Sequence, residues 1–279
     1  MTGMTDLPLA EIFVESDFTE TQQLNVAKWD VVAFTHACPG RTTPSEDSAA
    51  CFQLPDGTGV LVVADGVGGH QSGEVASAIA VRSIHHRLRS RASGTSLRAS
   101  ILDAIDDANQ AILDLGIGAA TTIAVVELNP SWIRPYHVGD SLITLLSQRG
   151  RVKWQAIGHA PVTYAIEAGV IDEEEAMGHP ERHLVSNVVG QEDMTISIGP
   201  KLQPGVRDTL VLCSDGLSDN VSTEELAELI RAGSLQPACE EVVRIAQTRM
   251  ASPGELQDVT GKPDDLTILA CRMSAPDKS

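Results

Sequence analysis

Several acidic residues of this chain stand where an apolar stretch meets a glycine turn or a loop. They are Asp65, Asp140, Asp215 and Asp264. Asp265 follows the last of them, and Glu46-Asp47 forms a further acidic spot just before an apolar stretch. Strand ends at one edge of a sheet can converge in space, and carboxylates that converge must share protons or bind cations. The recurring arrangement therefore predicts a carboxylate cluster at a sheet edge.

The donor atoms of this set favour hard divalent cations. Carboxylate oxygens are preferred ligands of Mg²⁺ and Mn²⁺, and the chain has no Cys-x-x-Cys pair that would form a softer site. Any single Asp-Gly pair is more simply explained as a turn. Ser214-Asp215-Gly216 repeats the pattern of Ala64-Asp65-Gly66, however, and this recurrence favours a metal site over a set of unrelated turns.

The elements before and after these acids must position them. Residues 60–64 are rich in β-branched side chains, which indicates a buried strand that ends at Asp65. Gly66 lets the backbone approach a ligand closely, so its carbonyl as well as the Asp65 carboxylate could face a cation. Further strands are predicted over residues 29–38, 49–54, 121–128, 131–138, 141–147, 152–157, 194–198, 208–214 and 266–272.

Helical periodicity predicts two long amphipathic helices after the first strands. One apolar stripe contains Val75, Ile79, Ile84 and Leu88, and the next contains Leu97, Ile101, Ile105, Ala108 and Ile112. Two more helices are predicted over residues 223–232 and 236–250. Strands followed by helices, twice over, indicate an α+β fold in which antiparallel sheets stack face to face with helices outside.

The chain is expected to form one large domain over residues 29–274. Residues 1–28 show no clear apolar period, and we expect them to be an extended lead-in that packs loosely. Residues 159–182 interrupt the succession of strands with short helical pieces and an acidic run, which indicates an insertion on the surface.

Composition excludes several classes of function. The formal net charge of −18 would repel a polyanion over most of the surface, so nucleic acid is not expected as a partner. Five scattered cysteines indicate neither a disulfide framework nor a zinc site and favour a reducing cytosol. No apolar run reaches the length of about 18 residues that a membrane span needs, so a soluble cytoplasmic protein is expected.

Ordered motifs follow one another between residues 46 and 267. They are Glu46-Asp47-Ser48, Ala64-Asp65-Gly66-Val67-Gly68-Gly69-His70, Gly139-Asp140-Ser141, Ser214-Asp215-Gly216 and Asp264-Asp265-Leu266-Thr267. In this order they resemble the motifs of the metal-dependent PP2C-type (PPM) serine/threonine protein phosphatases in their bacterial form. A set that spans nearly the whole chain is far more specific than any one of its members.

The resemblance implies a four-layer α-β-β-α sandwich of two antiparallel sheets flanked by helices, with a cluster of Mg²⁺ or Mn²⁺ ions at one edge. It implies that Asp65 bridges two ions and that the Gly66 carbonyl binds one of them. Asp215 and Asp264 would complete the second ion, and the family motif favours Asp264 over Asp265 as the ligand.

The remaining acids receive supporting roles from the same resemblance. Glu46 and Asp47 would hold metal-bound waters. Asp140 would form a third, weaker metal site with Asp215 and Asp219. Residues 159–182 fall where bacterial members carry a flap beside the active site, so the resemblance implies that this insertion is flap-like.

The function implied is hydrolysis of phosphoserine and phosphothreonine in proteins by direct attack of a metal-bridging water, which Asp47 could orient. The substrates would be phosphoproteins of a cognate serine/threonine kinase, and no membrane or nucleic acid is involved. Two alternatives remain open at this point. One is a catalytically weak regulatory binding module, and the other is a metal phosphoesterase that acts on small molecules.

The chain departs from the family pattern near the expected phosphate site. Arg41, the expected bidentate ligand of the phosphate, stands five residues before Glu46, whereas the family arginine usually stands four before. Val67 occupies the position of a histidine suggested as the general acid in eukaryotic members, and His70 is either a substitute or a surface residue. In the insertion, His159 and His179 either touch substrate or shape the loop.

Overall fold

The computed structural model describes residues 9–67, 72–92, 94–172, 175–176, 178–182, 184–251 and 261–274. Two six-stranded sheets, whose neighbouring strands all pair antiparallel, form the centre of the described chain. The first sheet has the order β1 (Leu9–Val14), β4 (Asp47–Gln53), β5 (Gly59–Asp65), β6 (Ile123–Leu128), β7 (Ile133–Val138) and β10 (Ser197–Ile198). The second has the order β2 (Gln22–Val26), β3 (Trp29–His36), β12 (Leu266–Met273), β11 (Thr209–Cys213), β8 (Leu142–Leu146) and β9 (Val152–Gln155).

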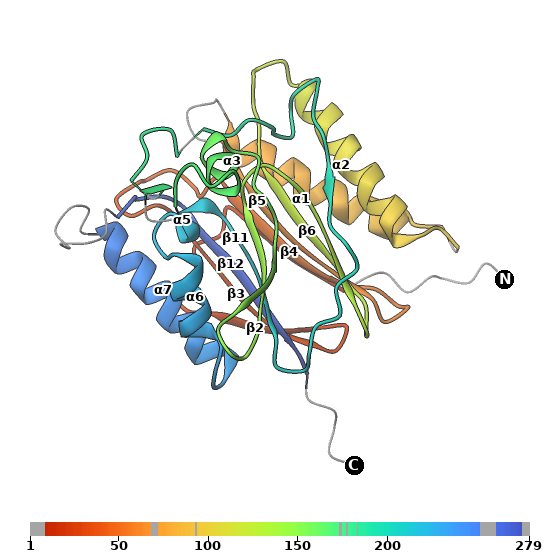
Figure 1. Cartoon of the computed structure of the whole chain (residues 1–279). Helices are drawn as coiled ribbons and strands as arrows, with labels where there is room; N and C mark the ends of the chain where they lie inside the picture. Colours follow the sequence, from red (N-terminus) through yellow and green to blue (C-terminus); the bar gives the residue numbers. More distant parts are fainter. Residues whose placement is uncertain are drawn as a thin grey trace, which may run out of the picture.

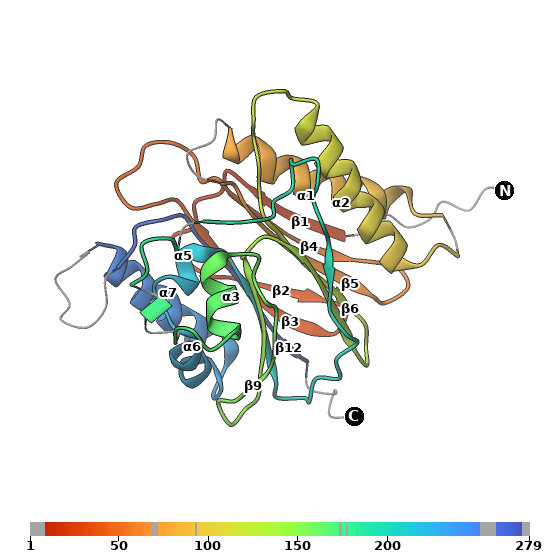
Figure 2. The same cartoon turned by 45° about the horizontal axis from the view of Figure 1, so that its top comes forward.

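Helices cover the outer face of each sheet, as Figures 1 and 2 show. The first sheet carries α1 (Gly73–Ser90) and α2 (Leu97–Leu113). The second carries α5 (Asp215–Ser218), α6 (Thr223–Ile230) and α7 (Leu235–Ala251). A short helix, α3 (Pro161–Glu167), follows β9. The predicted α-β-β-α sandwich is confirmed, and no helix of the described residues is long and apolar enough to cross a membrane.

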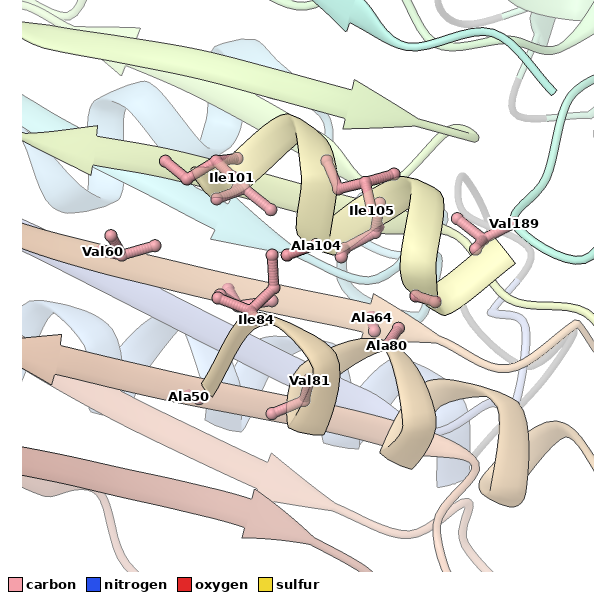
Figure 3. Packing of buried hydrophobic residues seen from close by; sticks show 14 of the residues in the cluster. Ala50, Val60, Ala64, Ala80, Val81, Ile84, Ile101, Ala104, Ile105 and Val189 are labelled. Atoms are coloured by element: carbon pink, nitrogen blue, oxygen red, sulfur yellow. The ribbon is translucent and has the colours of Figure 1, made fainter. Parts of the chain in front are cut away.

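Strand β5 shows how the side chains divide between the layers. Val60, Val62 and Ala64 belong to the cluster that packs against α1 and α2, whereas Leu61 and Val63 belong to the cluster between the sheets. This alternation is the two-residue period of a strand that is buried on both faces. Figure 3 shows the outer cluster, in which Ile84 and Ala80 of α1 and Ile101 and Ile105 of α2 lie over these strands.

The buried face of α1 differs in part from the prediction. Val75, expected in the apolar stripe, is 39% exposed, while Ala76, Ala80, Ile84 and Leu88 are buried at intervals of four residues. The small alanines form the start of the buried face because the helix lies close to the sheet there, and a pattern built on large apolar residues passes over them. The stripe predicted for α2 is confirmed, since all five of its residues are buried.

The expectation of a loose lead-in is wrong for residues 9–26. Strand β1 pairs with β4 from Leu9 opposite Gln53 to Val14 opposite Ser48, and β2 pairs with β3. Phe13 packs against the cluster between the sheets. Both are short edge strands with a partly exposed face, so their apolar pattern is too brief to identify from the sequence. Residues 1–8 lie outside the described part of the chain.

Candidate metal centre

Two neighbouring strands of the first sheet deliver the first pair of carboxylates. Asp47 begins β4 and Asp65 ends β5, and the two residues are direct partners in the antiparallel register. Thr122 fixes the backbone of Asp65: its Oγ1 accepts a hydrogen bond from the Asp65 N–H at 3.1 Å, and its N–H donates to the Asp65 carbonyl at 2.8 Å. The end of β5 is therefore held rigidly beside the start of β6.

Asp47 connects this pair to the second sheet. Its carboxylate is buried, and its Oδ2 accepts a hydrogen bond of 2.7 Å from the hydroxyl of Ser214 at the end of β11. The Ser214 hydroxyl in turn accepts from the N–H of Thr267 in β12 at 3.0 Å. The other oxygen of Asp47, Oδ1, has no hydrogen-bond partner among the described residues, which leaves it free to accept a bond from a ligand or a water.

Asp215 is the first residue of α5, where a turn was predicted, and its backbone N–H donates to Asp65 Oδ2 at 3.4 Å. Two glycines permit such close approaches. A Cβ on Gly216 would lie 1.9 Å from the carbonyl oxygen of Asp265, and a Cβ on Gly66 would lie 2.4 Å from that of Gly73. Glycine is therefore required at both positions for the segments to meet.

The predicted residues converge on one cavity of about 220 Å³. Its lining includes Arg41, Glu46, Asp65, Gly66, Asp140, Asp215 and Asp264. Asp47 lies beside Asp65 and Ser214, and Asp219 lines an adjoining cavity together with Asp140 and Asp215. The convergence of the strand-end acids is thus observed, while their role as metal ligands stays a prediction.

Asp264 and Asp265 differ in what their carboxylates contact. Asp265 is buried, and its two oxygens accept hydrogen bonds of 2.7 Å from the N–H groups of Cys38 and Glu46. Its carboxylate therefore holds the loop that carries Arg41. The Asp264 carboxylate contacts the cation of Lys262 instead, and its role as the metal ligand of the pair stays a prediction.

Lys262, which the sequence reasoning did not identify, lies among the acids. Its Nζ is 2.6 Å from Asp215 Oδ2, 2.8 Å from Asp219 Oδ2 and 3.1 Å from Asp264 Oδ2. Burial lowers the pKa of Lys262, but the carboxylates, above all Asp215, outweigh this and raise it above its ordinary value. No three His, Cys, Asp or Glu side chains of the described residues are arranged to hold one ion in this conformation. The acids surround an ammonium instead.

Burial strongly perturbs carboxyl groups of the candidate centre. It raises the pKa of Asp65 well above the ordinary value, and the neighbouring charge of Asp47 adds to the effect. Burial likewise raises the pKa of Asp140 to about 7, with a further contribution from Asp215. Carboxylates that are this difficult to ionise together are stabilised when a cation neutralises them.

Arg41 lies at the rim of the cavity. Its guanidinium group is 3.2 Å from Glu46 Oε2, and 45% of its side chain is exposed. An exposed guanidinium group beside a carboxylate cluster has donors left to grip an anion. The longer loop before Glu46 therefore still brings Arg41 to the site.

His159 has a structural position. It is buried, and its Nδ1 accepts hydrogen bonds from the Gly139 N–H at 3.1 Å and from the Asn187 amide at 2.8 Å. Its Nε2 donates to the Ser197 hydroxyl at 2.8 Å. Burial, with a contribution from stacked His137, lowers the pKa of His159 to about 4, so the ring is neutral near pH 7. It positions the Gly139 turn and hence Asp140.

The other predicted histidines give less information. His179 accepts a hydrogen bond of 3.1 Å from the N–H of Glu181 through its Nδ1, a contact within its own loop. His70 lies outside the described residues, as do Glu173 and Glu174 of the acidic run. The insertion that carries α3 lines the cavity next to the metal centre with Val162, Ile166 and Ala176.

Comparisons with known proteins agree with this geometry. The sequence profile of protein phosphatase 2C matches residues 37–258. Protein phosphatase PhpP of Streptococcus pneumoniae serotype 2 is 30% identical over 234 residues, which cover 79% of this chain and 91% of that protein.

Two solved structures extend the likeness to three dimensions. The serine/threonine phosphatase of S. agalactiae has a TM-score of 0.74 and 26% identity, covering 88% of this chain and 99% of that one. The catalytic domain of the serine/threonine protein phosphatase PstP in complex with two manganese ions has a TM-score of 0.69 and 25% identity, covering 88% and 97%. The profile match over most of the chain, with the acids converging as the motifs require, shows that the chain belongs to the protein phosphatase 2C family.

Proposed function

We propose that this protein hydrolyses phosphoserine and phosphothreonine in phosphoproteins with the help of two Mg²⁺ or Mn²⁺ ions and a weaker third one. The observation that carries the proposal is the convergence of strand-end carboxylates from both sheets on one cavity with Arg41 at its rim. The donor set fits these ions, because hard oxygen ligands and one unpartnered carboxylate oxygen, Asp47 Oδ1, meet at the same place.

In this proposal the carboxylates of Asp65, Asp215 and Asp264 and the carbonyl of Gly66 would hold two ions. When bound, such ions lower the pKa of water at the site and screen the charge of the phosphate. Asp140 and Asp219, which line the adjoining cavity with Asp215, would hold a third ion.

The protein groups supply positioning. Asp47, fixed through Oδ2 by the Ser214 hydroxyl, orients the attacking water through Oδ1, and Glu46 holds water beside it. Arg41 donates two parallel hydrogen bonds to the substrate phosphate. Direct attack by water needs no cysteine nucleophile, and all five cysteines are buried.

The test is dephosphorylation of a phosphopeptide with Mn²⁺, compared with the same assay in EDTA. Asp65→Asn and Asp215→Asn are expected to abolish hydrolysis of p-nitrophenyl phosphate while the circular dichroism spectrum stays unchanged. Asp107→Asn is the matched control, because it makes the same change of charge in the Arg87–Asp107 pair outside this cavity. Rates near those of wild type in either centre variant, with Mn²⁺ present, would remove this mechanism.

The same assay separates the alternatives. Refusal of phosphopeptides with hydrolysis of sugar phosphates would indicate a small-molecule phosphoesterase, and binding without turnover would indicate a regulatory module. The five free thiols support a reducing cytoplasm as the compartment. Phosphoproteins of a cognate serine/threonine kinase are the proposed substrates.

A further inference from the structure

We propose that Lys262 is a built-in competitor for the metal centre: its ammonium group occupies the position of one divalent cation and must leave before that cation binds. The proposal rests on the proposed function in one respect, namely that Asp215 and Asp264 bind a metal ion. It adds a residue outside the predicted ligand set that controls how readily they do so.

The contacts of the ammonium group carry the first step. Its Nζ lies 2.6, 2.8 and 3.1 Å from carboxylate oxygens of Asp215, Asp219 and Asp264, and it donates a hydrogen bond to Asp215. Only 21% of the Lys262 side chain is exposed. The ammonium group thus lies beside the carboxylates of Asp215 and Asp264, the two proposed ligands of one divalent ion, and a doubly charged ion held by them would repel it at short range.

The backbone around Lys262 carries the second step. Asn220 is fully buried, and its Oδ1 accepts a hydrogen bond of 3.0 Å from the Lys262 N–H. Its Nδ2 donates to the Lys262 carbonyl at 2.9 Å and to the Gly216 carbonyl at 2.8 Å. The base of the lysine is therefore anchored to α5, while its four-carbon stem can swing the charged end out to solvent.

The third step is a balance of charge. Without metal, the ammonium group compensates carboxylates that would otherwise be buried together unpaired, so it stabilises the empty centre. With metal, the same ammonium group must give up three close contacts, so it weakens the binding of that ion. A salt bridge with only a structural role would stabilise the metal-free protein without weakening the binding of the ion.

Calorimetric titration of EDTA-treated protein with Mn²⁺ tests the proposal. Lys262→Met, which keeps the length of the side chain without its charge, is expected to bind one class of Mn²⁺ about tenfold more tightly than wild type, which corresponds to about 1.4 kcal/mol. Its metal-free form is expected to melt at a lower temperature. Lys262→Gln should behave in the same way.

Lys153→Met is the matched control. Lys153 forms an ion pair of 2.6 Å with Asp208. Asp208 directly precedes β11, whereas Asp215 follows the other end of that strand. The control loses the same charge from a lysine–aspartate pair, and its Mn²⁺ affinity is expected to match that of wild type. Equal affinities in wild type and in both folded Lys262 variants would overturn the proposal.

A second measurement uses wild-type protein and needs no variant to fold. An amine-acylating reagent followed by mass spectrometry should label Lys262 several-fold faster when Mn²⁺ fills the centre, while Lys153 is labelled equally in both states. Equal labelling of Lys262 with and without bound Mn²⁺ would refute the displacement. If wild type hydrolyses phosphopeptides and binds Mn²⁺ but neither measurement changes, only the role of Lys262 fails; if Mn²⁺ does not bind at all, the proposed function fails with it.

Discussion

Asn220→Ala should destabilise the protein more than any exposed polar substitution, although Asn220 does not line either cavity of the candidate centre. The amide makes three hydrogen bonds of 2.8 to 3.0 Å and is 0% exposed. Each such bond contributes about 1 kcal/mol net, so the expected loss in the free energy of unfolding is about 3 kcal/mol. That is a large share of the about 5–15 kcal/mol that stabilises a typical protein.

Urea denaturation followed by circular dichroism measures this loss in metal-free protein. Asn129→Ala is the control, because the Asn129 amide oxygen accepts bonds only within an exposed turn and its loss should cost less than about 0.5 kcal/mol. Asn220→Asp keeps the volume and the acceptor but removes both donors and faces an anion toward two carbonyls, so it should cost at least as much as alanine.

Two results would refute the reasoning about Asn220. A loss below about 0.5 kcal/mol for Asn220→Ala would show that its hydrogen bonds are readily replaced by water. Wild-type stability in Asn220→Asp would show that the volume of the side chain matters and its donors do not.

Two further predictions concern the anion site and the buried acids. Arg41→Ala should raise KM for a phosphopeptide at least about tenfold through the lost phosphate contact; an unchanged KM in steady-state kinetics would assign the phosphate to other groups. Burial raises the pKa of Asp140 to about 7, from an unfolded value of about 3.9. The protonated Asp140 side chain therefore contributes its full stabilisation of the metal-free protein below about pH 4, and this contribution is lost as the pH rises through about 7. Urea titrations from pH 4 to 8 should show this decline, and Asp140→Asn should make it less steep, while buried carboxyls such as Asp65 keep part of it; the same slope in that variant would contradict the assignment to Asp140.

The position of the strand-end acids could be predicted because two independent signals coincide at each of them. An apolar stretch predicts the strand, and the glycine or loop after Asp65, Asp140 and Asp215 predicts where it ends. Antiparallel pairing then places these ends at one edge, as the direct pairing of Asp47 with Asp65 shows.

Other parts of the site leave no such signal. Lys262 is a single lysine in a loop, and its carboxylate partner Asp215 lies 47 residues away along the chain. Asn220 binds the Lys262 backbone across 42 residues, so neither contact has a periodic pattern. Strands β1 and β2 were missed because edge strands of five or six residues lack the repeated alternation that identifies central strands.

The hydrogen bond from Ser214 to Asp47 joins residues 167 positions apart and crosses from one sheet to the other. The predicted ligands likewise extend from Glu46 to Asp264, so segments that are far apart in the sequence must meet to form the centre. A nascent or prematurely ended polypeptide that lacks β12 would therefore carry most of the acids without a complete centre. Hydrolytic activity would therefore require β12 to pair with β3 and β11, so activity would also report the correct docking of the two sheets.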